Sequence, residues 1–72
     1  MNVVKLTSAE KNQTAEIKLK DETLTVRVLL SNGEELTGWQ FDYAAEGFDA
    51  GYAAAAAAFE VDRFERYGYV QH

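Results

Sequence analysis

The residue types that carry most enzyme chemistry are scarce in this sequence. It has no cysteine, its only serines are Ser8 and Ser31, and its only histidine, His72, is the last residue. Nucleophilic catalysis needs a hydroxyl or thiol beside a base, and both serines fall in predicted turns. A thiolate metal site is excluded, and an imidazole site is not expected at a chain end. The sequence therefore predicts a protein that is not an enzyme and carries no cofactor.

Three carboxylates spaced near one helical turn apart are the remaining candidates for chemistry. Asp42, Glu46 and Asp49 could share a helix face and bind Ca²⁺ or Mg²⁺ weakly, although the ligand spacing of an EF-hand loop is absent. The positive end of a helix dipole is sufficient reason for acids in its first turns. A divalent-metal-dependent regulator or small enzyme is therefore kept only as an alternative hypothesis.

Charge is segregated along the chain, whose net charge is −5. Residues 31–62 contain no Lys or Arg but seven acids: Glu34, Glu35, Asp42, Glu46, Asp49, Glu60 and Asp62. Such a stretch repels a phosphate backbone and attracts a basic surface. We therefore expect no direct nucleic-acid binding and a basic protein partner. The alternative interpretation is a solvated acidic surface that keeps the protein soluble.

The aromatic residues are the strongest anomaly, since all nine lie after residue 38. A 72-residue domain has a small core. The rings predicted to fill that core are Trp39, Phe41, Phe48, Tyr52 and Phe59. The rings left over are Tyr43, Phe64, Tyr67 and Tyr69. Surplus aromatic rings suit a protein interface. The alternative is that the tail after residue 66 folds back and caps the core.

Hydrophobic periodicity predicts the strands that position these rings. Residues 14–20 and 23–30 alternate with period two and are joined by a polar turn. Asn32-Gly33 predicts a two-residue type I′ turn into a third strand, with Val26 opposite Trp39. Residues 3–6 predict a further edge strand. A helical turn in the return loop at 7–13 is the alternative there.

A helical period begins near Tyr43, with Asp42 as the expected N-cap. Phe48, Tyr52 and Phe59 form one stripe that we expect to face the sheet. Val61 and Phe64 lie on the opposite face, so the helix either kinks near residue 61 or carries a second apolar surface. Gly68 is expected to end it. The predicted fold class is α+β, a two-layer single domain over residues 1–72. An antiparallel meander of three to four strands packs on one long C-terminal helix.

The leading functional hypothesis is a small acidic protein-binding module. It would act as a stoichiometric inhibitor or regulator that occludes a basic surface of a larger protein, such as one that itself binds nucleic acid. Phage-encoded inhibitors of host or CRISPR machinery share this size and charge, an analogy that rests on no motif. The predicted partner-binding residues are four acids and three rings: Asp42, Glu46, Asp49, Glu60, Phe64, Tyr67 and Tyr69.

A homo-oligomer that buries Val61, Phe64 and Tyr67 against a second copy is the first alternative.

No window of about 18 apolar residues exists, so no membrane span is predicted. The first residues lack the pattern of a signal peptide. The absence of cysteine fits a reducing compartment. We therefore expect a cytoplasmic protein.

Overall fold

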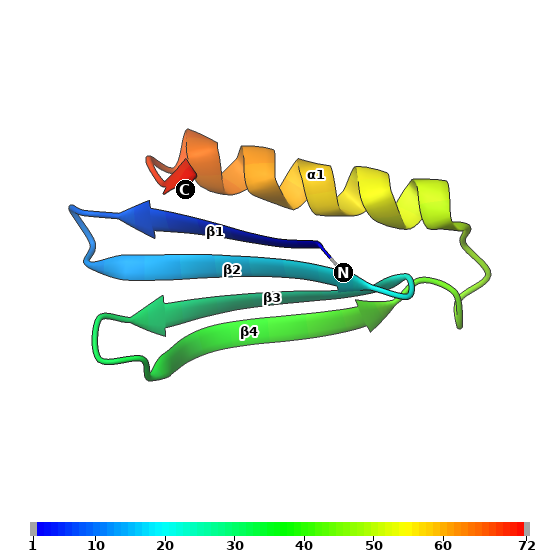
Figure 1. Cartoon of the computed structure of the whole chain (residues 1–72), viewed down its shortest axis with the longest axis horizontal. Helices are drawn as coiled ribbons and strands as arrows, with labels where there is room; N and C mark the ends of the chain where they lie inside the picture. Colours follow the sequence, from blue (N-terminus) through cyan, green and yellow to red (C-terminus); the bar gives the residue numbers. More distant parts are fainter. Residues whose placement is uncertain (1, 72) are drawn as a thin grey trace.

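The computed structural model describes residues 2–71, which form one antiparallel sheet and one helix (Figure 1). The elements in chain order are β1 (Asn2–Ser8), β2 (Gln13–Lys20), β3 (Thr23–Leu30), β4 (Glu35–Asp42), α1 (Ala50–Arg66) and β5 (Val70–Gln71). The strand order is β4-β3-β2-β1-β5, so the first four strands form a meander. The predicted two-layer α+β fold with a C-terminal helix is confirmed. The lone histidine, His72, lies outside the described residues.

The first strand exists as predicted, but it is not the edge of the sheet, because β5 lies beyond it. β1 pairs with β2 along its whole length, and the short β5 pairs with its other side at Leu6 and Thr7. The return loop holds a turn at residues 9–12, where the Ser8 hydroxyl accepts a hydrogen bond from the Lys11 backbone N–H at 3.2 Å. No helix forms among these described residues, so the strand-and-loop prediction is correct.

The two-residue turn with positive φ at both positions joins β2 to β3. Asp21 and Glu22 have φ of 50° and 61°, and Lys20 pairs with Thr23 around them. These are the backbone angles of a type I′ turn, whose twist matches the flanking strands. A polar turn was predicted at this position, but the type I′ geometry was predicted for Asn32-Gly33 instead.

The β3–β4 connection differs from the predicted type I′ turn. Gly33 alone takes the left-handed conformation there, at φ 88°. The Gly33 N–H donates to the Leu30 carbonyl at 2.9 Å, and the Leu30 N–H donates to the Glu34 carbonyl at 2.8 Å. This is a three-residue loop with a left-handed glycine, the next most common hairpin connection. The register slips by one residue between Val28 and Leu29, which restores the predicted pairing further along.

Beyond that slip the predicted register holds. Val28 faces Thr37, Val26 faces Trp39 and Leu24 faces Phe41. Successive side chains point to opposite sides of a strand, so all these residues share one face. We call this the inner face, because α1 packs on it. The helix packs chiefly on β2 and also on β1 and β3, whereas β4 lies farthest from the helix (Figure 1).

The helix begins seven residues later than predicted. Asp42 does cap a turn, since its Oδ1 accepts from the Ala45 N–H at 3.2 Å, but that turn stops at Gly47, where φ is 86°. Asp49 is the N-cap of α1 and accepts from the Tyr52 N–H at 2.8 Å. A glycine in the left-handed region interrupts helical geometry, which separates the two capped turns.

Gly68 ends the helix as predicted, at φ 94°. The Gly68 N–H donates to the Glu65 carbonyl at 3.0 Å, and the Tyr69 N–H donates to the Phe64 carbonyl at 3.1 Å. These two bonds are those of a Schellman motif, which commonly brings the residue after glycine against the last helical turn. Accordingly, the Tyr69 ring lies edge-on to Phe64 with centroids 5.2 Å apart.

The prediction of the buried helix face was wrong. Phe59 is 61% exposed and Tyr52 53%, whereas Ala53 is fully buried and Phe64 is 7% exposed. Phe48 lies before the helix and is also exposed. Small alanines let α1 approach the sheet closely, and Phe64 then fills the space beside Tyr69. The buried core is Leu6, Ala15, Ile17, Leu24, Val26, Val28, Phe64 and Tyr69.

Candidate protein-binding surface

Aromatic side chains that the helix leaves uncovered gather on the inner-face side of the molecule. They come from β4, from the 43–49 connection, from α1 and from its C-terminus. We call them the aromatic surface: Trp39, Phe41, Phe48, Tyr52, Phe59 and Tyr67, all classed as exposed. Trp39 and Phe41 belong here because β4 extends the sheet beyond the strands that α1 covers. Their predicted place in the core is therefore wrong.

Tyr43 organises one end of this surface. Its ring lies 4.5 Å from Phe41, 5.6 Å from Tyr52 and 5.8 Å from Phe48, centroid to centroid. Phe48 and Tyr52 stack on each other at 4.4 Å with an interplanar angle of 18°. Mutual ring contacts fix these side chains in place, so little conformational entropy is left to lose on binding.

Two pockets lie along the aromatic surface, one between α1 and Tyr43 and the other between α1, β3 and β4. The first, of about 400 Å³, is lined by Tyr43, Tyr52, Ala55, Ala56, Phe59 and Glu60. The second, of about 310 Å³, is lined by Val26, Val28, Thr37, Gly38, Trp39, Arg63, Phe64 and Tyr67. Glu60 of the first is bound to Arg63 of the second, with Oε1 and Nη2 2.6 Å apart. A concave apolar site with a few polar groups at its centre results.

The opposite flank of α1 carries a third pocket, of about 330 Å³. It is lined by Val4, Ile17, Leu19, Ala54, Ala57, Ala58, Val61, Asp62 and Glu65. Its apolar walls come from small and aliphatic side chains. It has no aromatic ring and therefore lacks the side chains that dominate binding energy at interfaces.

The predicted acidic residues have separate structural positions. Asp42 and Asp49 are exposed and act as caps, and Glu46 is exposed in the turn between them. Glu60 is buried at 8% exposure and pairs with Arg63 instead of facing solvent. Within residues 2–71 no group of three His, Cys, Asp or Glu side chains could hold a metal ion.

The three predicted aromatic anchors separate into core and surface. Phe64 and Tyr69 are buried, and the Tyr69 hydroxyl donates to Gln13 Oε1 at 2.8 Å. Burial also raises the pKa of Tyr69 above its ordinary value. Tyr67 is exposed and contacts Phe64 edge-on, with centroids 6.4 Å apart. Of the tail that was predicted as an alternative cap for the core, Tyr69 packs in the core, whereas Tyr67 and Val70 stay exposed.

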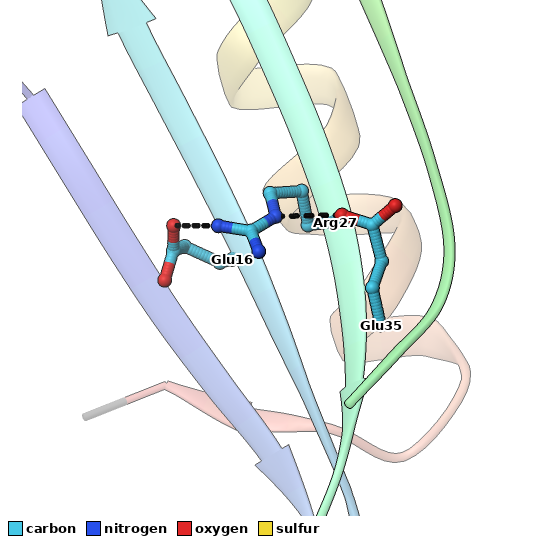
Figure 2. Close-up of polar contacts among 3 residues, drawn as sticks. All are labelled: Glu16, Arg27 and Glu35. Carbon is cyan, nitrogen blue, oxygen red and sulfur yellow. Dashed lines mark hydrogen bonds and ion pairs between the residues drawn. The ribbon is translucent and has the colours of Figure 1, made fainter. Parts of the chain in front are cut away.

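The outer face of the sheet has a different character. Arg27 of β3 reaches Glu35 on β4 at 2.8 Å and Glu16 on β2 at 3.7 Å, forming a charged ladder across three strands (Figure 2). The hydrogen bond to Glu35 raises the pKa of Arg27, desolvation opposes this, and the charges of Glu35 and Glu16 add to the rise. An antiparallel sheet with one solvated face is decorated in this way. The charged ladder distinguishes the outer face from the aromatic surface.

Comparison with protein-family models, curated proteins and solved structures finds no match to this chain. The described residues contain no helix long and apolar enough to cross a membrane. The surplus of rings in the sequence predicted an exposed aromatic surface, but of the three rings predicted for it only Tyr67 is exposed. Gly47, which delays the helix start, is a local signal that Phe48 lies before the helix, but it does not decide which face of the helix is buried.

Proposed function

We propose that this protein is a non-enzymatic binding module that docks on a larger protein through the aromatic surface. One observation carries the proposal: six large aromatic side chains stay exposed on one side of a domain that buries Ala53 and Phe64 instead. Contiguous exposed apolar patches are uncommon on monomeric proteins and mark interaction sites. Trp and Tyr are also the side chains most often found as interface hot spots.

The charge around the aromatic surface favours a basic partner. Asp42, Glu46 and Asp49 are exposed in the segment next to Tyr43, and no Lys or Arg occurs between residues 31 and 62. At the other end of the surface, Lys11 lies over the Tyr67 ring and Arg63 is paired with Glu60. Acids at the rim of an interface speed the encounter with a basic surface and exclude acidic ones. A stoichiometric inhibitor or regulator that occludes such a surface, in the cytoplasm, fits these features.

Removing rings that the fold does not need tests this proposal. The variant Tyr52→Ala/Phe59→Ala should keep the wild-type melting temperature, because both side chains are more than half exposed. It should lose capture of the proteins that the wild type retains from host extract, identified by mass spectrometry. Val3→Ala is the matched control, since Val3 is exposed on the outer face. If the double variant captures the same proteins equally well, the aromatic surface is not the binding site.

The acidic rim has a kinetic test with the captured partner. Glu46→Lys should slow association several-fold at low salt and change dissociation little, because charge steering acts before contact. Glu46 is the suitable choice, since the other two rim acids cap backbone N–H groups. An association rate that is unchanged at low salt would make the acids a solubility device.

A further inference from the structure

Strand β4 forms a free edge of the sheet. It is last in the strand order, and no described strand pairs with the edge of β4 that faces away from β3. All eight of its residues are exposed. The opposite edge is different, because β5 pairs with β1 and Lys5 lies mid-strand there. The two edges of one sheet are thus unequally protected.

The register shows which backbone groups reach that free edge. The Tyr43 N–H donates to the Glu22 carbonyl at 2.9 Å, so at this position the chain directs its backbone groups toward β3. In an antiparallel pair this direction alternates from residue to residue. The backbone groups of Phe41 and Trp39 therefore also point toward β3. The N–H and C=O groups of Gln40 and Gly38 point away from β3, to the free edge.

This edge carries few of the features that prevent edge pairing. Natural edges use charges, proline, bulges or very short strands for that purpose. From Thr37 to Phe41 the strand has no charged residue and no proline, and its one irregularity lies before Thr37. Five consecutive residues are therefore open to a further strand.

We infer that an extended, Lys/Arg-containing segment of a protein partner adds to the sheet as a strand beside β4. This inference rests on the proposed function and specifies how its partner is held. Backbone bonds to Gly38 and Gln40 would supply affinity, and alternate side chains of the added strand would lie against Trp39 and Phe41 on the inner face. The aromatic surface and the edge then form one continuous site.

Charge selects a basic segment over a second copy of this chain. The open stretch is bounded by Glu34 at one end and by Asp42 at the other, whereas Glu35, next to Glu34, is already paired with Arg27. Antiparallel pairing of two β4 strands brings the first end of one copy against the second end of the other. Like charges opposite one another destabilise such a pair. Lys or Arg at both ends of the added strand would instead meet a carboxylate.

Peptides selected from a random 12-residue phage-displayed library on the immobilised protein provide the probe. We expect enrichment of Lys/Arg at both ends, alternating apolar residues and no central proline. Binding of the best peptide should slow amide hydrogen exchange at Gly38 and Gln40 at least tenfold, because their N–H groups become ladder donors. Gln40→Pro removes one outward donor and should weaken binding at least tenfold, whereas Gln40→Thr retains it and should bind like the wild type.

The outcomes separate this inference from the proposed function. If Tyr52→Ala/Phe59→Ala abolishes peptide binding but Gln40→Pro does not, the docking surface stands and strand addition is overturned. Unchanged exchange at Gly38 and Gln40 in the wild-type complex overturns it without relying on a variant. Acidic consensus peptides, or no enrichment, also overturn it. A dimer of the chain alone that Gln40→Pro dissociates would assign the edge to a second copy.

Discussion

Strands β3 and β4 lie side by side on the same sheet face, yet one is core and the other is surface. Val26 and Trp39 are direct cross-strand partners, but Val26 is 2% exposed and Trp39 is 42% exposed. The side chain with the larger apolar area is therefore the more exposed of the two. The difference lies in α1, which packs on β1, β2 and β3 and leaves β4 farthest away.

Two features place the helix over the first three strands. Ala53 is fully buried, so the helix backbone sits close to the sheet, and a close helix covers a narrow strip. Phe64 and Tyr69 then anchor its last turn in the core. A helix held at this position cannot also cover Trp39 and Phe41. The comparison shows that a thin helix can keep a binding surface open beside a well-packed core.

The largest expected effect contrasts two phenylalanines of the same helix. Phe64→Ala should destabilise the protein by about 3–5 kcal/mol, because it opens a cavity in the core. That is comparable to the whole stability of a domain of this size. Phe59→Ala should change the free energy of unfolding by less than about 0.5 kcal/mol, since its side chain is largely in solvent.

Urea unfolding of both variants measures this contrast. Phe64→Leu serves as the control, because it retains most of the buried volume and should be clearly more stable than Phe64→Ala. A larger loss for Phe59→Ala than for Phe64→Ala would mean that the helix presents its other face to the sheet. The position of α1 would then not explain why β4 is exposed and β3 is buried.

An intermediate effect is expected at the loop that holds β4. Gly33→Val should cost about 1–2 kcal/mol, because a β-branched side chain resists the positive φ of 88°. No heavy atom lies within 4 Å of the added Cβ, so the cost is conformational. Gly33→Asn should lose less, since asparagine tolerates this region.

The Gly33→Val variant also tests whether β4 is held less firmly than β2. β4 is held chiefly through β3, so amide exchange in Gly33→Val should accelerate more in β4 than in β2. The amides of Trp39 and Ile17 report the two strands. Equal acceleration at both amides would show that β4 is no less firmly held than the helix-covered strands.

The smallest expected effect on stability concerns the hydroxyl of Tyr69, whose ring lies in the core. Tyr69→Phe removes the hydroxyl that donates to Gln13 at 2.8 Å. It should cost about 0.5–1.5 kcal/mol near neutral pH, the usual net contribution of one hydrogen bond. Chemical unfolding of the variant and the wild type measures the difference.

Tyr69 also predicts a pH dependence. Burial raises the pKa of Tyr69, so the folded state holds this proton more tightly than the unfolded state does. Its contribution to stability is complete below the unfolded value of about 10 and is lost as pH rises through the folded pKa. Tyr69→Phe should therefore lose less stability than the wild type on going from about pH 8 to about pH 11. Identical losses would show that Tyr69 ionises as it does in the unfolded chain.

Much of the sheet was predictable from the sequence because strand pairing is a local matter. Period-two alternation placed β2 and β3, and the pairing of Val26 with Trp39 followed from a short connection between adjacent strands. The loop itself was harder. Asn32-Gly33 suits two turn types that differ by one residue, and the choice between them needs the hydrogen bonds of Leu30.

The burial of the aromatic rings was not predictable in the same way. The helix carries one apolar stripe through Tyr52 and Phe59 and another through Ala53 and Phe64, and periodicity does not rank them. Ring size favoured the first stripe, but packing chose the second. Its alanines allow a close approach, and Phe64 meets Tyr69 only once the chain turns at Gly68.

The first four strands, the helix with its C-terminal stop, the charge distribution and the surplus of aromatic rings could thus be read from the sequence, whereas β5 could not. Each of these depends on residues near one another in the chain. Three further features depend on the packing of the whole chain: which rings lie in the core, the buried pairing of Glu60 with Arg63, and the free edge of β4. These depend on where the helix rests across the sheet. That position is set by the volumes of side chains far apart in the sequence, which must fill one shared core.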